Sequence, residues 1–218
     1  MRPEGKWLLA LVGTVLSSSA LSQDLFRSTN STVHSYNYVE VQYLVDTDAS
    51  PPLLATLLID LSDRWSVKAE FRNQDIDLVG VTEAGENQAG TDPIELSFEA
   101  QTLAIGALYH QPLALMNQSD WIAGFMIGRE EASVKVAAQN ISAEINTDFQ
   151  EIYAGVRRTL AARLEGEAAL NYYRSDNRDQ LSGDVKLVYR AFDNVDVALA
   201  INNIGDTDLF GIGLRYTW

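Results

Sequence analysis

The sequence predicts an all-β protein, a single up-and-down antiparallel β-barrel of ten strands. Apolar residues recur at every second position in segment after segment, and little of the chain repeats with the 3.6-residue period of a helix. Turn residues separate these segments, and the connections alternate between short and long. Eight strands remain the alternative, because residues 121–136 and the hairpin around 75–95 can be divided differently.

The first 22 residues are expected to be a secretory signal peptide. Arg2 and Lys6 precede an apolar run at residues 7–16, and small residues follow at 17–20. A retained membrane anchor is the alternative, but the apolar run is shorter than the ~20 residues that a spanning helix needs. The barrel domain is therefore expected at residues 23–218, with cleavage after Ser22 or Ala20.

Composition excludes several classes of site. The 218-residue chain contains no cysteine, so neither disulfides nor thiolate metal sites are available. Its 16 basic and 30 acidic residues give a net charge of −14, which argues against binding to nucleic acid or to anionic lipid surfaces.

The first half of the barrel is expected to hold strands at residues 39–45, 53–62, 65–75 and 102–110. The third of these is the most regular, with Trp65 and Val67 on one face and Lys68 and Glu70 on the other. A fifth strand is expected at 121–136. Apolar residues stand at both parities there, so its facing stays open, and a bulge near Gly128 is one interpretation.

The second half is expected to hold strands at residues 150–158, 163–173, 184–190, 195–202 and 210–218. Each places aliphatic residues on one face, as Phe210, Ile212 and Leu214 do in the last strand. The short connections are at 62–64, 161–162 and 192–194. The longer ones are at 46–52, 75–95, 139–148, 174–183 and 203–209, and 111–120 is longer than its short companions. Short turns at one end and long loops at the other are typical of transmembrane barrels.

The polar face of these strands carries an excess of ionisable residues. The fourteen predicted lumen residues are Glu40, Asp60, Lys68, Glu70, Arg72, Glu151, Arg157, Glu165, Glu167, Asp184, Lys186, Arg190, Asp196 and Arg215. In a soluble barrel they would face water, whereas in a membrane barrel they would fill a narrow lumen as mutually paired charges.

Aromatic residues favour the membrane barrel. Those near the short-turn end are Tyr36, Trp65, Tyr109, Trp121, Tyr189 and Trp218. Those near the long-loop end are Tyr43, Phe98, Phe149, Tyr172 and Phe210, of which Phe98 and Phe149 have the parity of the polar face. Two aromatic belts around an aliphatic band are typical of a barrel that spans a bilayer.

The ending GIGLRYTW resembles the C-terminal assembly signal of bacterial outer-membrane barrels. Gly213, Tyr216 and Trp218 match its glycine, its aromatic three residues later and its terminal aromatic, and Gly211 replaces the usual polar residue. Over residues 33–218 the pattern is similar to the small outer-membrane β-barrels of Gram-negative bacteria, the OmpA-like and porin-like superfamily. The resemblance implies targeting and fold, and it carries no activity.

No catalytic, cofactor-binding or metal-binding residue is predicted. The only histidines, His34 and His110, are expected to be solvated turn residues at the short-turn end, and no nucleophile or metal-ligand motif is present. We therefore expect a structural or cell-surface protein without catalysis. A narrow passive channel is the alternative, and a surface enzyme acting on protein or lipid A is the third.

The expected location is the bacterial outer membrane, with the short turns on the periplasmic side. The expected partners are outer-membrane lipid and lipopolysaccharide, and, during biogenesis, the barrel-assembly machinery and periplasmic chaperones. A monomer without nucleic acid is expected.

Overall fold

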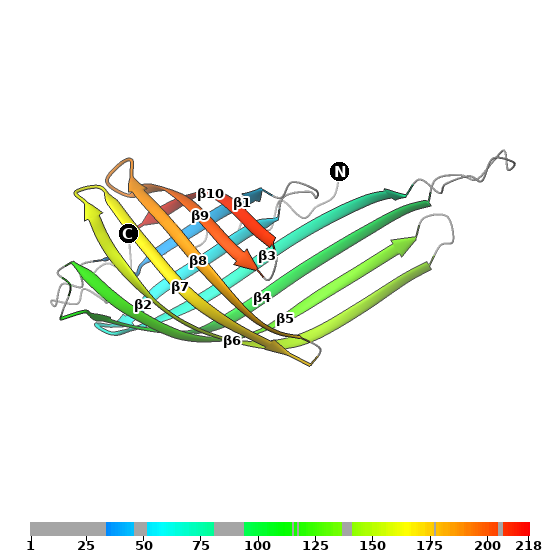
Figure 1. Ribbon diagram of the computed structural model, residues 1–218, viewed down its shortest axis with the longest axis horizontal. Coiled ribbons are helices and arrows are strands. Elements are labelled where there is room, and N and C mark those ends of the chain that lie inside the picture. The colour runs from blue at the N-terminus through cyan, green and yellow to red at the C-terminus, as the bar shows by residue number, and fades with distance from the viewer. Residues whose placement is uncertain are drawn as a thin grey trace, which may run out of the picture.

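The fold is an antiparallel sheet rolled into a closed barrel (Figure 1). The computed structural model describes residues 34–45, 52–80, 94–114, 116, 118–136, 141–176, 178–204 and 207–218. The predicted signal peptide, residues 1–22, lies outside the described residues. Among the described residues there is no helix of the length and apolarity that crossing a bilayer requires.

Ten strands make up the barrel in the described part of the chain. They are β1 (Tyr38–Val45), β2 (Leu53–Ser62), β3 (Trp65–Gly80), β4 (Ile94–Pro112), β5 (Ser119–Val136), β6 (Ile141–Ala161), β7 (Leu164–Ser175), β8 (Asp179–Arg190), β9 (Val195–Ile204) and β10 (Thr207–Thr217). Each strand pairs with the next along the chain, and β10 pairs with β1 to close the sheet. The prediction of a ten-stranded up-and-down barrel is confirmed.

The outer surface of the barrel is aliphatic. Its exposed side chains include Leu103, Ile105, Ile127, Ile152, Leu170, Val185, Leu187, Leu199, Ile201, Ile212 and Leu214. Because side chains alternate along each strand and cross-strand partners share a face, the intervening residues point into the barrel. We call this aliphatic surface the outer band.

Aromatic residues flank the outer band at both ends. Trp65 packs edge-on against Tyr109, and Tyr109 packs against Trp121, with ring centroids 5.0 and 5.1 Å apart. Tyr43, Tyr172 and Phe210 are exposed toward the other end. The expected places of Tyr36 and Phe149 in the belts are wrong, because these side chains are 1% and 6% exposed and lie inside the barrel.

Strand β5 runs without a bulge at Gly128, since its pairing with both neighbours is continuous through this position. Gly124 and Gly128 point inward, where added Cβ atoms would overlap the rings of Tyr153 and Phe149 from β6. These glycines therefore let two aromatic rings lie against the inner wall. Apolar residues occupy both faces of β5 because Ile122 and Met126 are buried inside while Phe125 and Ile127 face outward.

Strands β3 to β6 are longer than the sequence indicated, and they extend beyond the rest of the barrel (Figure 1). β2 pairs with β3 only as far as Asn73, and β7 pairs with β6 only from Phe149. Residues 74–80, 94–100, 129–136 and 141–148 thus form a four-stranded sheet, which we call the projecting sheet. The loops expected at 75–95 and 139–148 were too long, because β3 runs to Gly80, β4 begins at Ile94 and β6 begins at Ile141.

The projecting sheet is apolar on its inward face and polar on its outward face, the reverse of the barrel. This reversal explains why loops were expected at these residues. Ala132, Val134 and Ile145 stand at inward positions, whereas Arg129, Glu131 and other polar residues stand at outward positions. Arg129 Nε donates to Asp148 Oδ1 at 2.8 Å, and this bond lowers the pKa of the exposed Asp148 carboxyl. An outward face this polar lies beyond the outer band.

Candidate functional site

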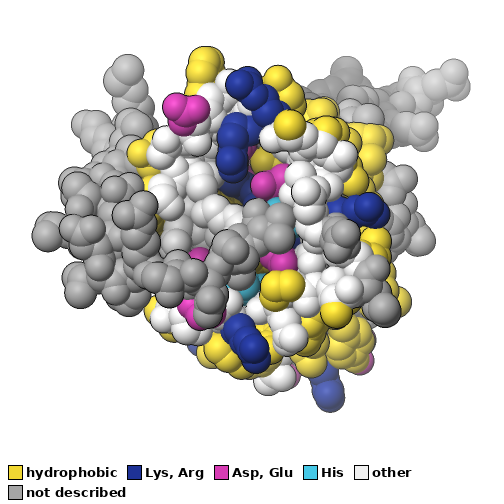
Figure 2. Space-filling model, turned by 90° about the vertical axis from the view of Figure 1, so that its left-hand side faces the viewer, with side chains coloured by type: hydrophobic (Ala, Val, Ile, Leu, Met, Phe, Trp, Pro, Cys, Tyr) yellow, Lys and Arg dark blue, Asp and Glu magenta, His cyan; other side chains and the backbone are white. Residues whose placement is uncertain are grey.

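All fourteen ionisable residues singled out in the sequence stand at inward positions of the barrel, and Arg190, at the rim, has a side chain that is 45% exposed. Their register positions share one face of the sheet, and several of them, including Glu40, Arg157, Asp196 and Arg215, are nearly inaccessible to solvent. Figure 2 views the short-turn end, where acidic, basic and histidine side chains gather near the centre and hydrophobic ones surround them. The closer contacts form separate clusters rather than one continuous network.

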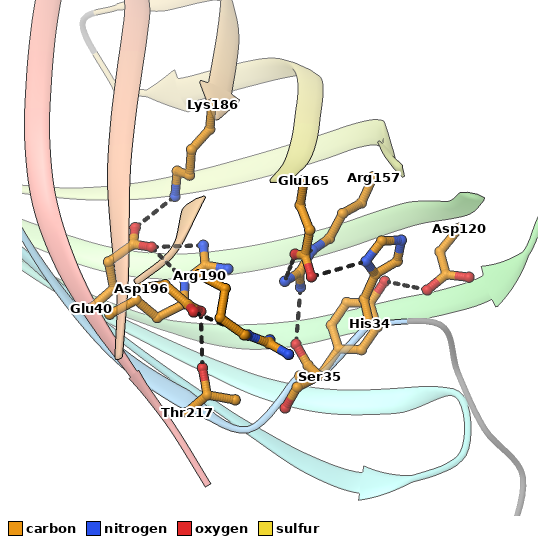
Figure 3. A network of polar contacts seen from close by, with 12 residues as sticks. His34, Ser35, Glu40, Asp120, Arg157, Glu165, Lys186, Arg190, Asp196 and Thr217 are labelled. Carbon is orange, nitrogen blue, oxygen red and sulfur yellow. Dashed lines mark hydrogen bonds and ion pairs between the residues drawn. The ribbon is translucent and has the colours of Figure 1, made fainter. Parts of the chain in front are cut away.

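The first cluster is centred on Glu40 of β1. Lys186 of β8 lies with its Nζ 2.7 Å from Glu40 Oε1, and Arg215 of β10 donates from Nε to Oε2 at 2.6 Å (Figure 3). The guanidinium of Arg215 also lies over the ring of Tyr38, 4.0 Å from its centroid. One buried carboxylate therefore pairs with two cations, and removing it would leave both without their partner.

The second cluster joins Arg157 of β6 to Glu165 of β7. Arg157 Nη2 is 2.6 Å from Glu165 Oε2, and Nε donates to the same oxygen at 3.1 Å. Arg157 Nη1 donates to the backbone carbonyl of Ser35 at 3.0 Å, and His34 Nδ1 lies 3.5 Å from Glu165 Oε1. The segment before β1 is thus held by side chains from β6 and β7.

Tyr36 extends these contacts to two more strands. Its hydroxyl donates to Asp120 Oδ2 of β5 at 3.0 Å, and its ring stacks on His110 of β4 with centroids 3.8 Å apart. In the barrel β1 adjoins only β2 and β10, so these bonds are made across the interior. Asn37 accepts from the backbone N–H of Asp60 in β2 at 2.9 Å. We call residues 34–37 the strap, since they cross the lumen at the short-turn end (Figure 3).

A third group lies where β8, β9 and β10 reach the short-turn end. Arg190 Nε is 3.3 Å from Asp196 Oδ1, and Thr217 donates to Asp196 Oδ2 at 3.2 Å. Farther inside, Lys68 and Glu70 of β3 pair at 2.7 Å, and Lys68 lies over the ring of Tyr153. Arg72, Glu151, Glu167 and Asp184 are at inward positions but have no ion pair within 4.0 Å among the described residues.

Apolar residues fill the other part of the interior, and sequence reasoning missed them. The buried cluster comprises Tyr36, Tyr38, Leu58, Ala104, Leu108, Ile122, Met126, Phe149 and Tyr153. Leu58, Leu108 and Ile122 have the parity of the polar face, which was the available signal. The interior of β1 to β6 is therefore packed like an ordinary protein core at the short-turn end.

A cavity of about 190 Å³ remains inside the barrel, on the long-loop side of the strap. Charged residues of both signs line it, including Lys68, Glu70, Arg72, Asp184 and Lys186. Tyr153 and Tyr173 contribute aromatic walls. Leu58, Leu108 and Ile122 of the buried apolar cluster and Tyr36 of the strap line the cavity as well.

Both histidines are buried, which corrects the expectation that they are solvated. His34 is 2% exposed and His110 is 0% exposed. His110 lies between the ring of Tyr36 and Asp60, whose Oδ1 is 3.4 Å from His110 Nε2. Within the described ranges, no three His, Asp or Glu side chains are grouped so that they could hold a metal ion.

No protein-family model matches the sequence, and no curated protein matches it. Among solved structures, the translocator domain of the autotransporter NalP from Neisseria meningitidis is similar with a TM-score of 0.52. That match has 10% identity and covers 99% of this chain and 98% of the other. The chain has the fold of an outer-membrane β-barrel. The aliphatic outer band is the surface that a barrel of this fold turns toward lipid.

Two other solved outer-membrane barrels align less well. OprG from Pseudomonas aeruginosa gives a TM-score of 0.45 at 11% identity, covering 85% of this chain and 97% of that one. The KdgM porin gives 0.41 at 9% identity, covering 83% and 99%. At such low identity the likeness concerns the outer-membrane barrel fold alone.

Proposed function

We propose that this chain is an integral outer-membrane protein with a closed lumen and a structural or cell-surface role. The observation that carries the proposal is the strap, whose Tyr36 contacts His110 and Asp120 on the far wall of the barrel. Two ion pairs, Arg157 with Glu165 and Arg190 with Asp196, narrow the rest of this end, beside a pocket of about 330 Å³ that Glu165, Arg190 and Asp196 line. In this proposal the fourteen inward charges are structural, each tolerated in the interior because it is paired or hydrated.

The orientation is part of the proposal. The short turns and the strap would face the periplasm, and the projecting sheet would stand outside the cell. Its polar outward face, with exposed Arg129 and Asp148, is unsuited to the hydrocarbon region. The orientation itself follows the general pattern of such barrels, in which the short turns are periplasmic and the longer connections external. Outer-membrane lipid and lipopolysaccharide would surround the outer band. Heat-modifiable migration on a gel, combined with membrane fractionation, tests insertion.

A narrow channel is the second candidate, favoured by the charged cavity of about 190 Å³. Recording from the refolded protein in planar bilayers separates the two functions. The closed barrel gives no reproducible unitary conductance. Unitary conductance that disappears when Arg157 or Arg72 is replaced would contradict the closed lumen and support the channel.

We propose no catalytic role for this barrel. His34 and His110, the natural candidates for a general base, are buried beside Glu165 and Asp60 at the end assigned to the periplasm. Hydrolysis of a casein or lipid A substrate by the purified protein, lost in His110→Asn while heat-modifiability is retained, would contradict this.

A further inference from the structure

The projecting sheet ends at a free edge formed by β6. Residues 141–148 pair with β5 on one side, from Val136↔Ile141 to Arg129↔Asp148. On the other side, pairing with β7 begins only at Phe149↔Ser175, and no described strand pairs with residues 141–148. Residues 141–148 therefore lie at an edge of the sheet (Figure 1). The N–H and C=O groups of alternate residues along this edge point away from the sheet.

The side chains along this edge alternate strictly. Ala143, Ile145 and Thr147 stand at inward positions, whereas Ser142, Glu144, Asn146 and Asp148 stand at outward positions. Ile145 is 57% exposed although it faces the concave side. Such alternation is the pattern of an ordinary amphipathic strand, with one face suited to an apolar neighbour.

The inward face beside this edge continues the apolar surface. Ala132 is the register partner of Ile145, and Val134 is that of Ala143. Phe98 and Ala100 of β4 are in turn the partners of Val134 and Ala132. An added strand that placed apolar side chains next to Ile145 would extend this surface by one more row.

On the outward face beside the edge, some charged side chains have an ion-pair partner, and among the described residues Glu144 has none. Arg129 pairs with Asp148 at 2.8 Å, and Lys135 Nζ lies 3.5 Å from Glu99. Glu144 is exposed and makes no ion pair with any described residue. An added strand that placed a cation opposite or diagonal to Glu144 would therefore supply the missing charge.

We propose that the β6 edge, residues 141–148, binds an extended peptide segment by strand addition. The segment has alternating apolar and cationic side chains, its apolar residues continue the face of Ile145, and its cations face Glu144. Backbone hydrogen bonds supply the affinity, and the alternation supplies the selectivity. The net charge of −14 disfavours a second copy of this chain as the occupant.

A capped octapeptide that alternates valine and lysine is the probe, with the full-length protein in lipid nanodiscs. Binding is measured by the fluorescence anisotropy of a labelled peptide at low salt. Hydrogen exchange reports where the peptide lies, and we expect slower exchange of the alternate amides of residues 141–148 that point away from β5. A control peptide has the same sequence but is N-methylated at the alternate residues whose N–H groups would bond to β6. It is expected to bind at least tenfold more weakly.

Two pairs of variants test the side-chain roles. Ile145→Lys places a charge on the apolar inward face and is expected to weaken binding at least tenfold, whereas Ser142→Lys, on the outward face, is expected to change it much less. Glu144→Gln is expected to weaken binding roughly two- to fivefold, the range for one exposed charge pair. Glu131→Gln, one strand farther from the edge, is expected to change it less than twofold. Heat-modifiability confirms that each variant is folded.

Three results would overturn the proposal. The first is equal binding of the methylated and unmethylated peptides, and the second is protection of lumen residues instead of 142–148. The third is spontaneous disulfide dimerisation of Asn146→Cys in this otherwise cysteine-free chain, with no peptide binding, which would make a second copy the occupant. The proposal goes beyond the closed lumen, since a barrel that conducted ions and still bound the peptide would contradict only the proposed function.

Discussion

Tyr36 stacks on His110 with ring centroids 3.8 Å apart and an angle of 12° between the planes. Tyr36 precedes β1, and His110 lies near the end of β4, three strands away around the barrel, so the contact crosses the interior. Both side chains are nearly inaccessible to solvent. Tyr36 thereby belongs to the buried cluster inside the barrel.

The hydroxyl of Tyr36 is expected to contribute to stability through Asp120. Tyr36→Phe keeps the stacked ring but removes the donor to a fully buried carboxylate. We expect the free energy of unfolding to fall by about 1 to 3 kcal/mol, the penalty for a buried acceptor that loses its partner. Urea unfolding in lipid vesicles measures this. Tyr189→Phe, on the exposed outer surface, is the control and should leave the midpoint unchanged.

Glu40 is expected to be the most sensitive of the inward charges. Glu40→Gln leaves Lys186 and Arg215 without their common anion, and breaking such a buried pair is destabilising by about 3 to 5 kcal/mol. Thermal loss of the heat-modifiable band measures the effect. Asp148→Asn removes the exposed partner of Arg129 and serves as the control, with no expected change. Equal behaviour of the two variants would refute the structural role of the Glu40 cluster.

Gly128 is expected to be required for packing against β6. Gly128→Ala sets a methyl group against the ring of Phe149 and the carbonyl oxygen of Leu103, and overpacking of this kind is destabilising by about 1 to 3 kcal/mol. At Gly183 the nearest atom to an added Cβ is 3.7 Å away, so Gly183→Ala is the matched control. Equal unfolding midpoints for both variants would show that Phe149 does not occupy this space.

The outer band is expected to lie in hydrocarbon. Ile212→Arg puts a charge in the middle of this band and should lower the free energy of unfolding by about 2 to 4 kcal/mol in a lipid bilayer. Gln101→Arg, on the outward face next to the projecting sheet, should have little effect. A similar small effect at both positions would mean that residue 212 is not surrounded by lipid.

Sequence reasoning succeeded where the aliphatic face of a strand points outward. Residues such as Val67, Leu103 and Leu214 alternate with polar neighbours, so the strands, their number and their closure could be predicted. It failed at residues 141–148, because Ile145 faces inward and Glu144 outward, the reverse of the pattern in the barrel. Because strands were identified only by an apolar outward face, this stretch was assigned to a loop.

The alternation of residues within each strand could not predict the long-range contacts in the interior. Parity placed Arg157 and Glu165 on the inner face, but nothing in either strand indicates that Arg157 donates to the carbonyl of Ser35. The strap is short and has no strand pattern. Its position follows from partners on five strands, β2, β4, β5, β6 and β7.

The central claim is that the strap crosses the lumen, and proton NMR of the protein in nanodiscs tests it most directly. With the ring centroids of Tyr36 and His110 3.8 Å apart, we expect cross-relaxation peaks between the protons of the two rings. Absence of these peaks, with the signals of both rings assigned, would contradict the account.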